Sequence, residues 1–238
     1  MRKLICRRRL PRVMLTLILG EAELELVPSE LLEAPSVKAR SRHRRRKPAH
    51  LLLDQAADHV AMSKLDEGDR RGRPDIVHLV ALLLHDSPLA HAGRARMLVH
   101  TRHDELVRMR PGLRPPRAQA TFYKLCEDLL RQGRVPLDKP LLTMERARPL
   151  ADILASEARG LVVLLSEDGE PSRTRDFEQL AREHTDVTLV LGGFPKGTWR
   201  RRPEAARMMR VAQEQITAAS ALVPALAGFE DALLRPEG

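Results

Sequence analysis

The segment Arg70–His78 carries side chains well suited to holding an anionic ligand. Pro74 suits the first turn of a helix, and Asp75 would then lie beside the free amides and the positive dipole end of that helix. Asp75 is also near enough in sequence to fix the direction of Arg73. The pattern predicts either a well-capped helix with solvated arginines or a guanidinium oriented toward an anion.

Polar and ionisable side chains also follow an apolar run in the segment Val99–Glu105. Open α/β sheets bind ligands at the ends of their strands, so this position suits a site. His100 and His103 have neither a cysteine partner nor a helix-borne histidine pair, and we therefore expect them to form hydrogen bonds rather than bind zinc. No metal site is predicted.

The segment Arg108–Arg117 alternates cations with prolines. Proline restricts a chain before binding, so less entropy is lost when its arginines contact phosphates or base edges. A merely rigid basic loop is the alternative interpretation. Few aromatic residues lie nearby, so an aromatic platform for stacked bases is not predicted.

A glycine-rich turn, Val190–Gly197, follows another apolar run. Without side chains at Gly192 and Gly193, backbone amides and carbonyls can close around a ligand. The spacing fits neither the dinucleotide-binding pattern GxGxxG nor the phosphate-binding pattern GxxxxGK[ST]. The turn on its own therefore predicts a ligand-permissive loop without naming the ligand.

Short apolar runs separated by helix-length segments indicate the elements that position these residues. Such alternation predicts an α/β fold, a parallel sheet flanked by helices. The predicted strands cover residues 13–19, 51–53, 97–101, 161–166 and 187–191. The predicted helices cover residues 56–65, 74–85, 117–131, 145–158 and 205–234, and Pro224 is expected to break or kink the last one.

The charge balance points to a polyanionic partner. The 238 residues include 41 Lys and Arg against 32 Asp and Glu, a net charge of +9, and the arginines are clustered. Because guanidinium groups match phosphate oxygens, nucleic acid is favoured over a small acidic metabolite, although charge alone leaves a membrane surface open. Residues 38–47 are mostly cationic, and we expect a mobile basic loop that contacts phosphates, the alternative being a solvated charged stretch.

The N-terminal region and the cysteines bear on the setting of the protein. We expect residues 1–13 to be a basic extension that need not be ordered, before a single domain at 14–238, with Met14 a candidate natural start. A signal peptide is disfavoured because acidic residues follow the short apolar run where a cleavage site should lie. Only Cys6 and Cys126 are present, so no disulfide framework is expected. A cytoplasmic protein without a membrane span is predicted.

Taken in order, these segments resemble the Nep/Emg family of ribosome-biogenesis methyltransferases, in the SPOUT class. The resemblance runs over most of the chain and is carried by segments that match in the same order. They are Leu15–Leu19 with Glu23–Pro28, Leu52–Asp54, Arg71–His78, Asp86–Leu89, Val99–Arg102, Arg114–Arg117, Leu164–Glu167 and Gly192–Gly197.

The resemblance implies a SPOUT-type fold whose C-terminal part is threaded as a trefoil knot that holds S-adenosyl-L-methionine (SAM). It also implies a homodimer with a continuous basic surface. The residues implied to bind SAM are Leu165, Gly192, Gly197, Thr198, Trp199, Val211, Ala212, Gln213, Glu214, Gln215 and Ile216. The stretch from Val211 to Ile216 lacks the Leu-Ser and Pro-Leu character common in the family, which leaves its register open.

For RNA, the resemblance implies contacts from Arg73, oriented by Asp75, and from Arg114 and Arg117. A further arginine of the family pattern is Thr121 here, and the cations of residues 40–46 are a plausible substitute. The partners implied are small-subunit ribosomal RNA (rRNA) and a second copy of the chain, with ribosomal proteins as further candidates.

The implied activity is SAM-dependent methylation of N1 of a pseudouridine in small-subunit rRNA. A sulfonium is already a good leaving group, so the protein chiefly has to place the nitrogen in line with the methyl carbon and exclude water. The catalytic residue is left unknown. A non-catalytic RNA chaperone that uses the same basic surface is the main alternative, and a small-molecule methyltransferase is a third.

Overall fold

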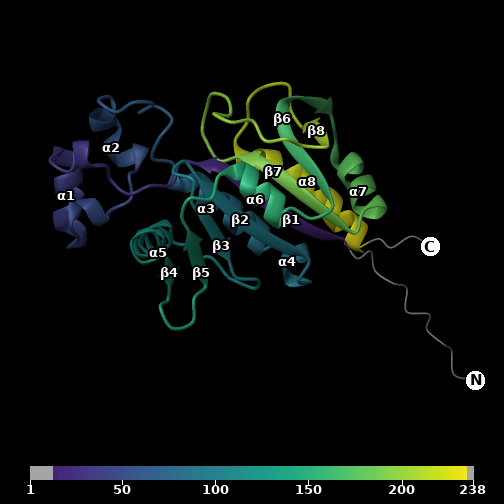
Figure 1. Cartoon of the computed structure of the whole chain (residues 1–238), viewed down its shortest axis with the longest axis horizontal. Coiled ribbons are helices and arrows are strands. Elements are labelled where there is room, and N and C mark those ends of the chain that lie inside the picture. Colours follow the sequence, from purple (N-terminus) through teal and green to yellow (C-terminus); the bar gives the residue numbers. More distant parts are fainter. Residues whose placement is uncertain (1–12, 235–238) are drawn as a thin grey trace, which may run out of the picture.

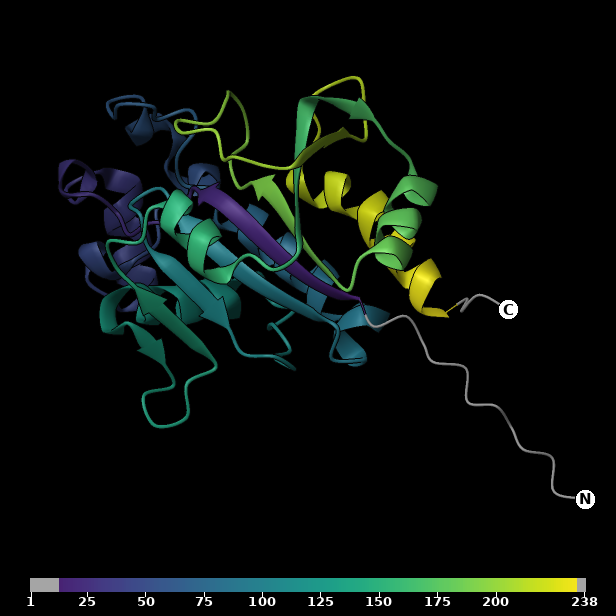
Figure 2. The same cartoon turned by 45° about the vertical axis from the view of Figure 1, so that its right-hand side comes forward.

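The computed structural model describes residues 13–234, which form an eight-stranded sheet flanked by helices (Figure 1). The strand order is β4-β5-β3-β2-β1-β7-β6-β8. Turning the molecule shows the sheet as a twisted layer with helices on its faces (Figure 2). The α/β prediction is confirmed, while the predicted basic extension lies, except for Val13, outside the described residues.

The sheet is mixed rather than wholly parallel. Its strands are β1 (Met14–Ala22), β2 (Ala95–Thr101), β3 (Leu106–Met109), β4 (Arg134–Val135), β5 (Leu142–Glu145), β6 (Leu161–Pro171), β7 (Asp186–Gly192) and β8 (Arg207–Arg210). The pairs β1–β2, β1–β7, β6–β7 and β6–β8 are parallel. The pairs β2–β3, β3–β5 and β4–β5 are antiparallel, which corrects the prediction for this edge.

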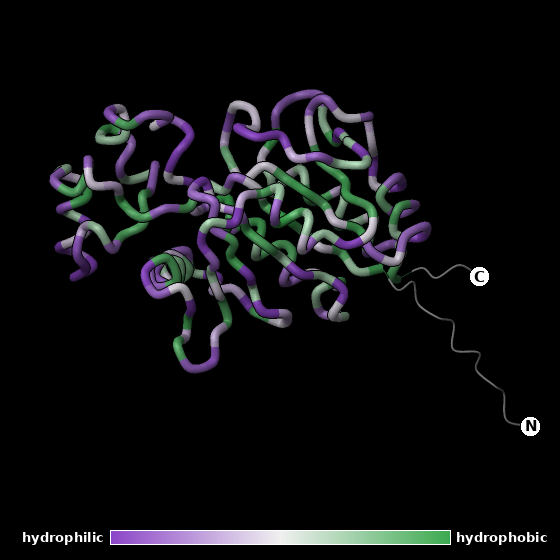
Figure 3. Tube along the Cα trace, viewed as in Figure 1, coloured by the Kyte–Doolittle hydropathy of each residue, from purple (hydrophilic) through white to green (hydrophobic). Residues whose placement is uncertain are grey.

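Helices cover both faces because the central strands are apolar on both. The helices are α1 (Pro35–Arg44), α2 (Gln55–Met62), α3 (Pro74–His85), α4 (Pro88–His91), α5 (Gln119–Gln132), α6 (Leu150–Glu157), α7 (Thr174–Glu183) and α8 (Ala218–Leu234), with short 3₁₀ turns at Ser29–Leu31 and Pro48–His50. Leu17 of β1 joins the larger core, whereas Ile18 packs with Ile153 of α6 on the other face. The tube is accordingly greenest along the inner strands (Figure 3).

The segment 38–47 was predicted wrongly as a mobile loop. Most of it lies in α1, which begins at Pro35 and ends before Arg45 in a left-handed conformation. With α2 it forms a lobe around a separate small core that includes Val37, Leu51 and Met62 (Figure 1). Residues 51–53 are not a strand of the sheet either, since Leu52 forms only an isolated bridge with Leu26.

The C-terminal third also differs from the predicted single helix. Residues 207–210 form β8, a loop follows, and α8 runs from Ala218 to Leu234 without a break at Pro224. The predicted helix at 145–158 is shorter and Glu145 ends β5 instead. The trefoil knot concerns threading rather than strand pairing and stays a prediction. Within residues 13–234, every helix falls short of the length and apolar character that a membrane span needs.

Candidate functional site

A pocket of about 200 Å³ lies where the ends of β6 and β7 meet the segment after β8 and the first turns of α8. Two further segments complete it: the loop after β7 and the chain leading into α8. Its lining residues are Leu165, Ser166, Glu167, Asp168, Leu191, Gly192, Phe194, Gly197, Thr198, Trp199, Arg202, Met209, Arg210, Val211, Ala212, Glu214, Gln215, Ile216, Ala218 and Ala221.

This pocket brings together the residues expected to hold SAM from three separate parts of the sequence. Leu165, the Gly192–Trp199 loop and the 211–216 segment all contribute to the wall. Gln213 is the one expected residue that does not line it. A concave site at the carboxyl ends of parallel strands is where α/β sheets bind ligands.

Close packing under the loop explains why a small residue is needed near the end of β1. A Cβ on Gly20 would lie 2.7 Å from the Trp199 ring, so only glycine lets Trp199 approach the strand. Trp199 in turn meets Phe194 edge to face at 5.3 Å between ring centroids. The two aromatic rings and Gly20 therefore fix one wall of the pocket.

Arg73 and Asp75 form the oriented pair that the sequence predicted. Arg73 Nε and Nη2 donate to Asp75 Oδ1 and Oδ2, each at 2.8 Å, in a two-pronged arrangement at the start of α3. This pairing raises the pKa of Arg73 further, with the hydrogen bond from Asp75 as the main cause. The guanidinium is thus held in one direction at a partly exposed position.

Helix α3 also holds the basic segment that contains Arg114 and Arg117. His78 Nε2 lies 2.7 Å from the carbonyl of Pro116, and its ring stacks on Phe122 at 4.4 Å. Asp86 at the end of α3 lies 3.8 Å from Arg117. Arg73, Arg114 and Arg117 are therefore carried by segments packed on one helix, and Arg114 is exposed without an ion pair to any residue in 13–234.

Comparison with known proteins identifies the family. A family model described as EMG1/NEP1 methyltransferase matches residues 17–230. The chain belongs to this family. It is 41% identical over 220 residues to a Pyrobaculum calidifontis protein named ribosomal RNA small subunit methyltransferase Nep1, covering 91% of this chain and 98% of that protein.

Two further relatives agree with this EMG1/NEP1 membership. A Thermococcus kodakarensis protein of the same name is 37% identical over 220 residues, covering 92% of this chain and 99% of its own length. A crystal structure of Archaeoglobus fulgidus Nep1 bound to S-adenosylhomocysteine matches with a TM-score of 0.80 at 30% identity, covering 92% of this chain and 99% of that one.

Some pocket residues of this EMG1/NEP1 chain were missed by sequence reasoning. Asp168 and Arg202 lie 3.1 Å apart across more than thirty residues of sequence, and both line the pocket. Arg210, at the end of β8, fell inside the predicted C-terminal helix. The Arg200–Arg202 run beside the glycine turn was the one available signal, and no role was predicted for it.

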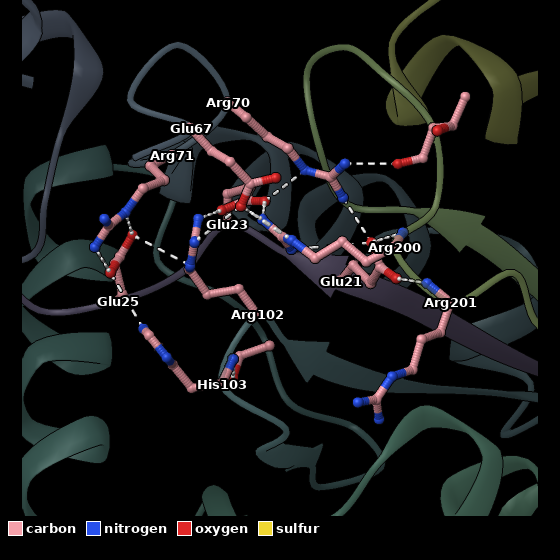
Figure 4. Close-up of polar contacts among 12 residues, drawn as sticks. Glu21, Glu23, Glu25, Glu67, Arg70, Arg71, Arg102, His103, Arg200 and Arg201 are labelled. Carbon is pink, nitrogen blue, oxygen red and sulfur yellow. Dashed lines mark hydrogen bonds and ion pairs between the residues drawn. The ribbon is translucent and has the colours of Figure 1, made fainter. Parts of the chain in front are cut away.

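A network of buried ion pairs lies beside the pocket in this EMG1/NEP1 chain (Figure 4). The carboxylates of Glu21, Glu23 and Glu25 are nearly inaccessible, and arginines from other segments pair with each. His103 lies 3.2 Å from Glu25, and His100 accepts a hydrogen bond from the Glu21 amide. Both histidines thus form hydrogen bonds, as predicted.

Glu25 makes stability depend on pH. Burial alone would raise its pKa, but hydrogen bonds from Arg71 and His103 outweigh burial and lower it from 4.5 to about 2. A carboxyl with a lowered folded-state pKa stabilises the fold above pH 4.5 and loses that contribution as pH falls toward 2. One pKa unit corresponds to about 1.4 kcal/mol, so the contribution is at most roughly 3 kcal/mol.

We therefore expect Glu25→Gln to remove part of the acid sensitivity. The urea midpoint of the unsubstituted chain should fall between pH 5 and pH 3, and that of the variant should start lower and fall less over the same range. Urea unfolding at several pH values measures both slopes. Equal slopes for the two proteins would contradict the role given to Glu25.

Proposed function

We propose that this chain transfers a methyl group from SAM to N1 of a pseudouridine in small-subunit rRNA, as a step of small-subunit biogenesis in the cytoplasm. The observation that carries the proposal is one pocket built from Leu165, the Gly192–Trp199 loop and the 211–216 segment. The printed names of the relatives and the S-adenosylhomocysteine bound to the Archaeoglobus fulgidus protein support it.

The chemistry of the pocket fits this donor. Glu167, Asp168 and Glu214 offer carboxylates to a ligand that carries a sulfonium and an ammonium group, while Arg202 offers a partner for its carboxylate. Leucine, methionine and tryptophan side chains supply apolar wall for an adenine ring. The residues proposed to bind the donor are Leu165, Gly192, Gly197, Thr198, Trp199, Val211, Ala212, Gln213, Glu214, Gln215 and Ile216.

Bound here, SAM would supply an electrophilic methyl carbon attached to a good leaving group. The chain's own residues then have to orient the base and exclude water, and positioning accounts for most of the rate. Asp75 is not assigned as the base that takes the N1 proton, since both its oxygens accept from Arg73. A carboxylate engaged in this way stays ionised and is a weak base.

The proposed RNA surface comprises Arg73, Arg114 and Arg117, with Asp75 acting through Arg73. A target base has to leave its stack to reach a pocket, so we expect an RNA loop rather than a continuous duplex. The exposed apolar residues Leu79 of α3 and Val223 of α8, on helices that pack together, support the proposed homodimer. Sedimentation equilibrium tests it, and a monomer mass would contradict it.

The cations of the α1 lobe divide into two groups with different expected effects. Arg44 and Arg46 are bound to Glu127, which is fully buried, whereas Arg42, Arg45 and Lys47 are exposed and form no ion pair with a described residue. Only the second group is available to phosphates. Inside the lobe, the first group is structural.

We expect the triple variant Arg42→Ala/Arg45→Ala/Lys47→Ala to weaken RNA binding and to lower its salt dependence by up to about three charges. Its melting temperature should stay unchanged. The matched variant Arg44→Ala/Arg46→Ala should instead lower the melting temperature, because it leaves a buried carboxylate unpaired. Salt-dependent RNA titrations and thermal melts measure the contrast. An unchanged salt slope in the triple variant would remove the lobe from the RNA surface.

A non-catalytic RNA chaperone built on the same basic surface is the second candidate, favoured by how many exposed arginines lie outside the pocket. Calorimetric titration with SAM distinguishes the two. Binding at micromolar concentrations supports the methyltransferase, whereas no heat of binding from the folded protein supports the chaperone. Equal activity on free pseudouridine and on an RNA hairpin would instead favour a small-molecule enzyme.

A further inference from the structure

Glu21 lies between the pocket and the arginine-rich segment that begins at Arg70. One of its oxygens accepts from Arg70 Nη2 at 2.6 Å and from the Arg200 amide at 3.0 Å, and the other accepts from the Arg201 amide at 3.0 Å. Glu21 is only 4% exposed. Its carboxylate thus fixes the backbone that follows Trp199 (Figure 4).

Arg70 holds the same loop from the other side. Its Nη1 donates to the carbonyl of Thr198 at 2.6 Å, and its guanidinium lies 3.9 Å from the centre of the Phe194 ring. Arg70 is 7% exposed, so these contacts are made away from water, where they are strong. The loop at residues 198–201 is therefore clamped between one buried carboxylate and one buried guanidinium.

Glu23 extends the network toward Arg73. Its carboxylate accepts from Arg70 Nε at 2.8 Å and from Arg102 Nη1 at 2.6 Å. Its carbonyl accepts from the Arg73 amide at 2.9 Å. One continuous set of contacts therefore joins Thr198 in the pocket wall to Arg73.

The backbone of Glu21 indicates that its position is enforced. Its φ is +49°, a left-handed conformation that side-chain-bearing residues seldom adopt. The amide donates to His100 Nδ1 at 3.0 Å, and His100 Nε2 lies 2.9 Å from Asp104. Strained conformations persist where surrounding contacts determine them, and this one aims the carboxylate at the loop.

We infer that Glu21 and Arg70 are positioning residues that couple the 198–201 loop to Arg73, so that RNA bound at Arg73 changes the loop. The inference extends the proposed function, because the loop forms a wall of the proposed donor site. Reciprocity then requires that RNA and donor strengthen each other's binding by the same factor. A contiguous set of contacts becomes a coupling path only when the coupling is measured.

The chain provides a reporter that works without any donor. Trp199 is the single tryptophan in the sequence and lies in the loop. Titrating the full chain with a synthetic RNA hairpin that carries a pseudouridine in its loop should shift Trp199 fluorescence in the unsubstituted protein. The same shift should be lost or strongly reduced in Glu21→Gln, although the hairpin still binds.

Glu25→Gln is the matched control. Glu25 is as buried as Glu21 and binds Arg71 through both oxygens, but within the described chain it makes no contact with residues 198–201. It should lose stability while keeping the fluorescence response. If Glu21→Gln does not fold, Arg70→Lys serves instead, since it keeps the charge and loses the fork that reaches Thr198 and both carboxylates.

Calorimetry with S-adenosylhomocysteine gives the second readout. RNA should tighten its binding about 5- to 50-fold in the unsubstituted protein and in Glu25→Gln, and by less than about 2-fold in Glu21→Gln. A Trp199 response that persists in Glu21→Gln or Arg70→Lys would overturn the coupling. Absence of S-adenosylhomocysteine binding with the Trp199 response intact would overturn the proposed donor and leave the coupling standing.

Discussion

Replacing Gly197 by valine is expected to raise the Kd for S-adenosylhomocysteine by about 30-fold or more. Gly197 has a φ of +83°, and a β-branched residue there costs more than about 2 kcal/mol unless the loop moves. Moving the loop displaces Thr198 and Trp199, which line the pocket. Calorimetric titration measures the loss, and affinity for the RNA hairpin should stay within about 2-fold because the arginine surface is elsewhere.

Gly93→Val is the matched control for this prediction. Gly93 has a φ of +68°, and no atom lies within 4 Å of the place that a Cβ would take, so the variant suffers backbone strain without a clash. It precedes β2, which runs parallel to β1, and therefore lies at the amino end of the parallel strands, away from the pocket. Equal losses of donor affinity in both variants would mean that Gly197 acts through general stability.

Removing the three proposed phosphate contacts together should have the largest effect on RNA binding. In Arg73→Ala/Arg114→Ala/Arg117→Ala, the slope of log K against log salt should fall by about 3, and affinity near 0.15 M salt should fall about 100-fold or more. The donor site should be unaffected. Fluorescence anisotropy of a labelled hairpin over a salt series measures both quantities.

Arg175→Ala provides the comparison for that variant. Arg175 is 83% exposed on α7, far in the fold from α3. Its loss should change neither the salt slope nor the affinity. If the triple variant behaves like Arg175→Ala, the assignment of Arg73, Arg114 and Arg117 is wrong and the RNA surface lies elsewhere.

The sequence predicted the central strands and α3 well because their apolar patterns are strong. It missed the antiparallel edge, since β3 and β5 are four residues long and β4 only two, too short for a periodic signal. It missed α1 because the cations looked unburiable. Arginine is a good helix former, and the inner arginines find Asp58 and Glu127, partners that are distant in sequence.

For the candidate site, the glycine turn and Leu165 were accessible from motif order and family resemblance. The pairing of Asp75 with Arg73 followed from spacing and is confirmed. The roles of Glu21 and Arg70 could not be foreseen, because the clamp depends on side chains 49 positions apart meeting a loop near residue 200. Folding alone creates such neighbours.

Mass spectrometry of methylated RNA tests the central claim most directly. The purified chain, SAM and two hairpins that differ only in pseudouridine or uridine at one loop position are incubated, digested and analysed. The account predicts one added methyl group, on N1 of pseudouridine, in the first hairpin and none in the second. No methyl transfer by a folded protein that binds both ligands, or equal transfer to the uridine hairpin, would contradict it.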